Sequence, residues 1–224
     1  MNFLWYPIAE LPFVALAALA GFTIHEFAHA WTAYKFGDDT AYREGRVTLN
    51  PMAHLDLIGA LFLLIAGFGW AKPVPVRRSN FKHPRAMNIA VTAAGPISNL
   101  LLAALGIVAL YLLQAANVHM SDAGIQTFWT FLKYWLQINM ILLLFNLIPL
   151  PPLDGYRILE EFMPLGLRIR MMQYEQWSFF LFLLFVFIAP LRRVTIDPLF
   201  GLMTPILGGI SSVCEFIFGG PRLL

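Results

Sequence analysis

The sequence predicts an all-α integral membrane protein with about five to six transmembrane or re-entrant helices and short extended segments near the membrane surface. Of its 224 residues, 59% are hydrophobic and only 12% are charged. A soluble domain typically has about 25% charged residues, so lipid is the expected solvent. The mean hydropathy is +0.69, and long apolar runs recur along the chain. Its length leaves room for roughly five spans of about 20 residues with short loops.

Two apolar runs lie in the N-terminal third of the chain. The first, Pro7–Tyr34, is long enough to span a bilayer, and its central part Leu11–Ile24 carries no charge. A polar loop, Lys35–Asp56, follows it, and Arg46–Leu49 within this loop is a candidate short strand. The second run, Leu57–Ala71, has about 15 residues, which is short for a span. We therefore expect this run either to re-enter the membrane or to cross it.

A strongly basic loop follows the second run. Its cationic residues are Lys72, Arg77, Arg78, Lys82 and Arg85. The part Lys72–Val76 is predicted to be extended, because each of its prolines biases the preceding residue away from helix. Basic loops remain in the cytoplasm of membrane proteins, so this loop is expected on the cytoplasmic side.

The C-terminal part of the chain is predicted to contain further spans. The third run, Ala86–Val118, and the fourth, about Ile125–Pro149, are both long enough to cross the membrane. The connection Asn117–Gly124 has no Lys or Arg, as expected of an outside turn. Two more apolar runs, Gln176–Leu191 and Pro198–Cys214, are expected to add C-terminal spans.

The charge balance argues against a nucleic-acid partner. The net charge is only +2 and the isoelectric point is about 8.8, with most basic residues in loops beside apolar segments, where they set topology. Cys214 is the sole cysteine, so no internal disulfide is expected. The segment Met1–Pro7 lacks a basic region, and no signal peptide is predicted there.

The first apolar run contains an H-E-x-x-H pattern formed by His25, Glu26 and His29. Residues four apart share one face of a helix, so both imidazoles can bind one metal ion. Glu26 is adjacent to this face and can accept a proton from water without being a ligand. On a soluble helix these residues could form a solvated face, but ionisable groups in a membrane span are costly and indicate a function. A catalytic zinc site usually needs a third protein ligand.

The end of the fourth apolar run offers that ligand. Pro149, Pro151 and Pro152 cannot continue a helix, so the chain is expected to unwind near the membrane surface. Asp154 follows this break, and Gly155 permits an unusual turn after it. An Asp-Gly pair alone is more often a plain turn. Asp154 is therefore a candidate ligand because it can pair with the two histidines.

Three motifs together resemble the site-2 protease family of intramembrane zinc metalloproteases, in a minimal type without PDZ or CBS modules. They are the H-E-x-x-H pattern at 25–29, the G-x-x-x-N element at 95–99, and N-x-x-P-x-P-x-L-D-G from Asn146 to Gly155. The resemblance implies a single membrane-embedded peptidase domain over residues 1–224, with a catalytic core of about 7–160 and additional C-terminal spans at about 175–218.

The resemblance also implies roles for individual residues. One Zn²⁺ per chain would be bound by His25, His29 and Asp154, with Glu26 as the general base. Asn146 would bind substrate or stabilise the oxyanion. Asn99 would line the same cavity, although interhelical hydrogen bonding is an equal alternative for it.

A transmembrane segment of another protein is the substrate that the resemblance implies, cut in regulated intramembrane proteolysis. The protein would be a multi-pass protein of the cell membrane with its active site near the cytoplasmic side. His54, which precedes the second apolar run, is either an accessory site residue or a surface-loop residue. The alternatives to a protease are a zinc transporter, which needs ligands along a path, and an inactive homologue that serves as a binding scaffold.

Overall fold

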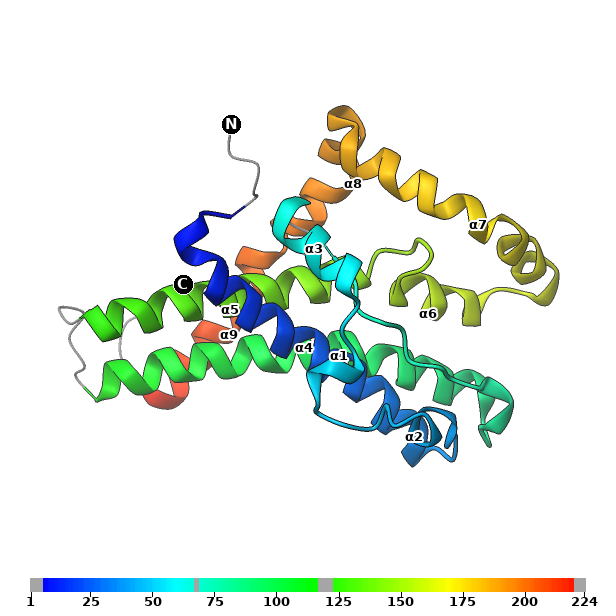
Figure 1. Cartoon of the computed structure of the whole chain (residues 1–224), viewed down its shortest axis with the longest axis horizontal. Helices are drawn as coiled ribbons and strands as arrows, with labels where there is room; N and C mark the ends of the chain where they lie inside the picture. Colours follow the sequence, from blue (N-terminus) through cyan, green and yellow to red (C-terminus); the bar gives the residue numbers. More distant parts are fainter. Residues whose placement is uncertain (1–5, 67–68, 117–122, 220–224) are drawn as a thin grey trace.

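The computed structural model describes residues 6–66, 69–116 and 123–219 (Figure 1). Within these residues, every regular element is a helix. The longer helices are α1 (Leu11–Lys35), α3 (Leu57–Ala66), α4 (Pro84–Ala115), α5 (Ala123–Asn146), α6 (Asp154–Phe162), α7 (Leu165–Phe187), α8 (Ala189–Gly201) and α9 (Met203–Phe218). The short ones are α2 (Thr40–Arg43) and the 3₁₀ turns η1 (Ile8–Glu10), η2 (Pro51–Ala53) and η3 (Arg78–Asn80). The predicted all-α fold is confirmed.

Within the described part of the chain, four helical stretches are long and apolar enough to cross a membrane. They are Ile8–Lys35, Pro84–Ala115, Gly124–Asn146 and Ala189–Phe218. The second apolar run gives only the 10-residue helix α3. At 1.5 Å per residue it is about 15 Å long, half of the roughly 30 Å hydrocarbon core. The structure therefore favours partial insertion of α3 over a full crossing.

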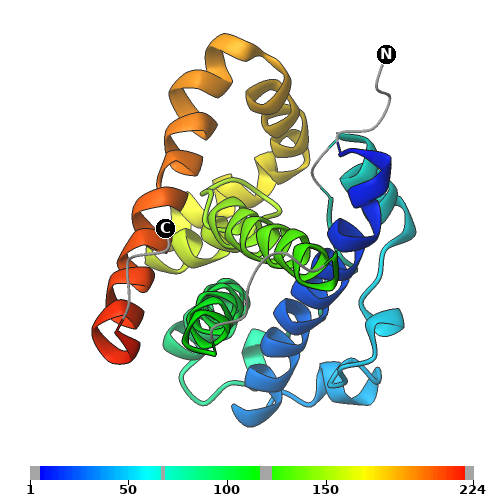
Figure 2. The same ribbon diagram turned by 90° about the vertical axis from the view of Figure 1, so that its left-hand side faces the viewer.

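The site is built on a bundle of α1, α4 and α5, with α9 packed along α4. Figure 2 shows α4 between α1 and α9, whereas the hairpin of α7 and α8 projects from the bundle. The core between α4, α5 and α9 contains Ile107, Met140 and Cys214, all buried. The Tyr111 hydroxyl donates a hydrogen bond of 3.0 Å to the Ser211 carbonyl and so joins α4 to α9.

The polar loop between α1 and α3 is held by side chains. The predicted strand at Arg46–Leu49 is wrong, since these residues form bends and irregular chain. A strand needs a ladder of backbone hydrogen bonds, but the loop meets the next segment through the Lys72 N–H, which donates to the His54 carbonyl at 2.8 Å. The Arg46 guanidinium also donates to the Lys72 carbonyl. As predicted, Lys72–Val76 is not helical.

Asp38 is the buried anchor of this loop. Its carboxylate accepts hydrogen bonds from the Thr40 hydroxyl at 2.6 Å, the Arg77 N–H at 2.6 Å and the Asn80 amide at 2.8 Å. Burial raises the pKa of Asp38, but these hydrogen bonds outweigh burial and the pKa lies below its ordinary value. The stabilisation is therefore complete above the ordinary pKa of about 3.9 and is lost as pH falls through the folded-state pKa.

We expect Asp38→Asn to lower the free energy of unfolding at neutral pH by about 1–3 kcal/mol, because the amide leaves buried donors unsatisfied. Thermal melting of the detergent-solubilised protein measures this effect. The difference from the native protein should shrink as pH falls below about 4, where the Asp38 carboxylate of the unfolded chain begins to be protonated, and should be lost as pH falls through the lower folded-state pKa. Asp39→Asn is the matched control, since the Asp39 side chain is 44% exposed and pairs with the exposed guanidinium of Arg43. Equal losses in both variants would contradict the prediction.

The predicted break after α5 is confirmed. The helix ends at Asn146, and α6 begins at Asp154. The intervening chain folds back tightly enough that a Cβ on Gly155 would lie 2.3 Å from the Leu147 carbonyl oxygen. Only glycine tolerates this approach, and the fold-back directs Asp154 toward α1.

Candidate metal centre

Three side chains with metal-binding atoms converge inside the bundle. His25 and His29 come from α1, and Asp154 is the first residue of α6. Asp154 Oδ2 lies 3.2 Å from His25 Nε2 and 3.3 Å from His29 Nε2. The two Nε2 atoms are 3.0 Å apart. Among the described residues these three form a group that could hold a metal ion.

The geometry of this group fits zinc. Tetrahedral zinc with bonds of about 2.0–2.2 Å requires ligand atoms roughly 3.3 Å apart, close to the separations observed. Asp154 Oδ2 is buried and has no hydrogen-bond partner among the described residues. A buried carboxylate oxygen without a donor is costly unless a cation binds it.

Hydrogen bonds to the far side of each ring orient the imidazoles. His29 Nδ1 lies 2.8 Å from the Val91 carbonyl, which can only accept, so Nδ1 carries the proton. His25 Nδ1 lies 2.7 Å from Asn99 Oδ1, which likewise places a proton on Nδ1. Both Nε2 lone pairs are then directed to the metal position, as in metal sites where an outer hydrogen bond selects the tautomer.

The Asn99 side chain is bonded to Nδ1 of His25, the ring nitrogen that does not face the metal position. Asn99 is not among the residues that line the cavity beside the metal group. It is fully buried, and its amide donates to the Gly21 carbonyl at 3.2 Å and to Asn139 Oδ1 at 3.0 Å. The expectation that Asn99 lines the cavity is therefore wrong for this arrangement, because neighbouring helices enclose its side chain. The interhelical alternative describes its contacts.

Asn139 is a supporting residue that the sequence reasoning missed. It is fully buried in α5, accepts from Asn99, and donates to the Trp135 carbonyl at 2.9 Å. The available signal was an amide in the middle of an apolar span.

Gly95 allows α4 to pass against the two histidines. A Cβ at this position would lie 2.4 Å from His29 Nε2 and 2.7 Å from His25 Cε1. Any larger residue must therefore displace the rings. The G-x-x-x-N element thus has two structural roles. Gly95 leaves room for the imidazole rings of His25 and His29, and Asn99 accepts a hydrogen bond from His25.

Gly95→Ala is expected to weaken zinc binding by at least about 10-fold, the scale of a disturbed outer ligand shell, because the new methyl group displaces the imidazoles. Zinc affinity can be measured by competition with a chelator. Gly209→Ala in α9 is the control, since its Cβ would meet nothing within 4 Å. Unchanged affinity in Gly95→Ala would contradict this account of the site.

A cavity of about 540 Å³ opens on the metal group. Its wall includes Glu26, Asn146 and the irregular segment from Gly69 to Val76. The Asn146 amide donates one hydrogen bond of 2.9 Å to the Leu142 carbonyl. Glu26 and Asn146 therefore share one chamber with all three candidate ligands.

His54 lies outside the metal group. It is buried, with 1% of its surface exposed, so it is not a surface-loop residue. Its Nε2 is 2.8 Å from the Thr48 carbonyl, and its side chain lines a second, smaller pocket.

A buried carboxylate that the sequence did not single out fixes the other end of α6. Glu161 forms an ion pair of 2.8 Å with Arg78 and accepts a hydrogen bond of 2.8 Å from Asn88. Arg78 and Asn88 also line the cavity. Asp154 and Glu161 thus hold α6 against the bundle near its two ends.

Comparison with known proteins identifies the family. Residues 114–189 match peptidase family M50. YwhC of Bacillus subtilis is 48% identical over 198 residues, covering 88% of this chain and 90% of that protein. Rip2 of Mycolicibacterium smegmatis is 30% identical over 180 residues, covering 78% and 66% of the two chains. MJ0611 of Methanocaldococcus jannaschii is 25% identical over 150 residues, covering 65% and 68%.

Each of these relatives carries a name that classes it as a zinc metalloprotease. No solved structure matches the chain. The extent of the match to YwhC, the candidate membrane-spanning helices and a group of residues that could bind a metal ion support one conclusion: the chain belongs to peptidase family M50 and is a zinc-dependent intramembrane metalloprotease.

Proposed function

We propose that this protein hydrolyses peptide bonds in transmembrane segments of other membrane proteins, with Glu26 as general base and with His25, His29 and Asp154 as the zinc ligands. One observation carries the proposal: the three-ligand group and Glu26 share a single cavity whose walls include residues of three candidate membrane-spanning helices, α1, α4 and α5. The substrate segment is helical in the membrane, so it must unwind locally before its carbonyl can be attacked. We further propose that this cleavage serves regulated intramembrane proteolysis.

Zinc bound by this group would supply a Lewis acid that polarises the scissile carbonyl and makes a water molecule acidic. The Glu26 carboxylate accepts the proton of that water and passes it to the nitrogen of the departing peptide. Asn146 has one N–H bonded to Leu142, and its other N–H is the proposed donor to the developing oxyanion.

The irregular chain beside the metal group is the proposed platform for the unwound substrate. Val74 and Val76 line the cavity, and neither backbone N–H has a backbone hydrogen-bond partner among the described residues. Pro73 and Pro75 lack an N–H, and alternate residues of an extended chain point to opposite sides. The free donors of this segment are therefore on one side, where an extended peptide could add by β-pairing.

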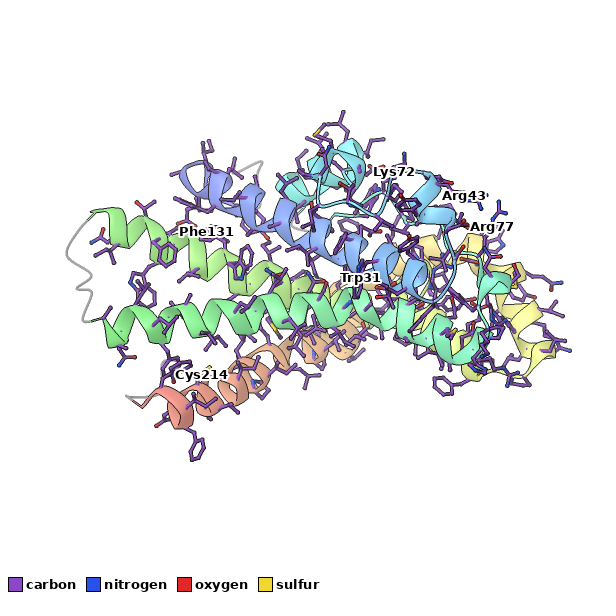
Figure 3. The ribbon with its side chains drawn as sticks, turned by 90° about the horizontal axis from the view of Figure 1, so that it is seen from below. Trp31, Arg43, Lys72, Arg77, Phe131 and Cys214 are labelled. Atoms are coloured by element: carbon purple, nitrogen blue, oxygen red, sulfur yellow. The ribbon has the colours of Figure 1, made fainter. Side chains whose placement is uncertain are left out.

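The distribution of charge supports a cytoplasmic position for the cavity, in a multi-pass protein of the cell membrane. Figure 3 shows Arg43, Lys72 and Arg77 toward one end of the bundle, with Phe131 and Cys214 toward the other. Arg78, like the residues of the metal group, lines the cavity. Basic residues accumulate on the cytoplasmic side of membrane proteins.

The chain is proposed to form one peptidase domain over residues 1–224. The core of about 7–160 supplies every proposed catalytic and zinc-binding residue. The helices from about 175 to 218 extend this core, with α9 packed on α4.

The test is cleavage of a single-span reporter, tagged at both ends, in proteoliposomes with the purified protein. We expect two fragments in the presence of zinc and none after chelation. A zinc-sensitive dye inside the same vesicles tests the transporter alternative, which needs ligands along a path; the described residues contain one three-ligand group. Zinc influx without cleavage would overturn the proposal, and so would an intact reporter with zinc-loaded protein.

A further inference from the structure

A second cavity, of about 170 Å³, lies between α1 and α3. It adjoins the proposed catalytic chamber and shares part of its wall. Its wall includes Ala15, Leu19 and Phe22 of α1, Ala60 and Leu63 of α3, and Trp70.

The two cavities are neighbours. Phe22, Trp70 and Ala71 line both of them. Phe22 also precedes Glu26 by four residues, about one helical turn on the same face of α1. A peptide lying across Glu26 would therefore place a side chain near the shared wall of Phe22 and Trp70.

The wall of the second cavity is suited to an apolar occupant. The Thr23 hydroxyl donates to the Leu19 carbonyl at 2.6 Å, and Asp56 accepts from the Gly59 N–H at 2.8 Å. His54 Nε2 is bonded to the Thr48 carbonyl, whereas His54 Nδ1 is buried and has no hydrogen-bond partner among the described residues. Most of the other side chains in the wall are apolar. Apart from His54 Nδ1, the wall offers few polar atoms, so a polar side chain entering this space would lose its hydration with little in return.

The size of the cavity matches one large side chain. An apolar cavity of about 150 Å³ accommodates benzene, so 170 Å³ is enough for a leucine, methionine or phenylalanine side chain. The outer face of α3, with Leu57, Ile58 and Leu61, is exposed, whereas its inner residues Ala60 and Leu63 face the cavity. This short helix thus forms the outer wall of the pocket.

We infer that this pocket is a specificity subsite that receives a large apolar side chain of the substrate beside the scissile bond. The inference rests on the proposed function and deepens it. It gives α3 the role of completing the pocket wall, to which His54 also contributes. The substrate class is therefore a membrane segment with a bulky apolar residue next to the cut.

The test begins by mapping the cut in a reporter segment by mass spectrometry. Reporters with Ala, Leu or Phe at each of the two flanking positions are then compared in proteoliposomes. At one position we expect kcat/KM for Leu or Phe to exceed that for Ala by about 10-fold or more, the range for burying several methylenes. Ala60→Leu and Ala15→Leu, which fill the pocket, should bring this ratio close to one.

Two further variants complete the design. Leu19→Ala enlarges the pocket and should raise the Phe-to-Leu ratio, so a filled variant that fails to fold does not remove the test. Ala20→Leu is the matched control, since Ala20 is on α1 but lines neither cavity, and it should keep the native preference. Zinc content and melting temperature are recorded for every variant.

The outcomes separate the subsite from the proposed function. Cleavage of all reporters at equal rates, or a preference that neither filling nor enlarging the pocket alters, would overturn the subsite and leave the protease proposal intact. A lipid chain in the pocket would give that second result. Failure of the zinc-loaded native protein to cut any reporter would overturn both.

Discussion

Glu26→Gln is expected to lower the turnover of a membrane reporter by about 10²–10⁴-fold, the usual contribution of a general base, while the protein still binds one zinc ion per chain. Glutamine keeps the shape of the side chain but cannot accept the proton from water. Because Glu26 is not among the three converging ligands, its replacement should leave the metal in place.

Reporter cleavage and zinc content must be measured on the same preparation. Glu44→Gln is the matched control, since Glu44 is exposed in the loop after α2 and should have native activity. Loss of zinc together with activity would show that Glu26 maintains the metal site. Native turnover in Glu26→Gln would exclude it as the base, and zinc flux surviving the substitution would support transport.

The sequence predicted the parts of the site that depend on local geometry. His25 and His29 share a face because of helical periodicity alone, and the helix break before Asp154 follows from the covalent structure of proline. Each is fixed within about ten residues of chain. Their meeting was inferred from the resemblance, and it depends on α5 and the following fold-back against α1.

The parts that the sequence could not predict depend on packing between distant segments. Asn139 supports the site because it meets Asn99 from a different helix, and Glu161 does so because Arg78 and Asn88 converge on it. The predicted strand at Arg46–Leu49 failed for the same reason. A strand exists only if a partner lies in register, whereas Asp38 and Arg46 hold this loop by side-chain hydrogen bonds.

The surroundings of His54 could not be decided from the sequence. Its position before an apolar run was compatible with an accessory site residue or with a surface-loop residue, and its burial excludes only the second. The structure places it in a pocket that forms only when α3 folds back against α1. The pocket is a property of two elements together, and neither segment alone contains a signal for it.

Asp154→Ala is expected to weaken zinc binding by more than about 100-fold and to abolish cleavage. Changes in the outer shell of a zinc site already cost about 10- to 100-fold, and this substitution removes one of three ligands. The remaining imidazoles, with Nε2 atoms 3.0 Å apart, can bind zinc, but without the carboxylate that balances its charge. Zinc titration against a chelator measures the affinity, and Asp39→Ala, at a partly exposed carboxylate that does not line the cavity, is the control.

The pairing of this variant with Glu26→Gln separates two roles within one cavity. Asp154→Ala should lose metal and activity together, and excess zinc should restore little cleavage, because the fold-back at Gly155 would no longer hold an oxygen against both imidazoles. Asp154→His should recover part of the zinc affinity, since imidazole is also a good zinc ligand. Native zinc affinity in Asp154→Ala would mean that the carboxylate meets the histidines only as an ion-pair partner, and the third ligand would then have to come from another group in the cavity.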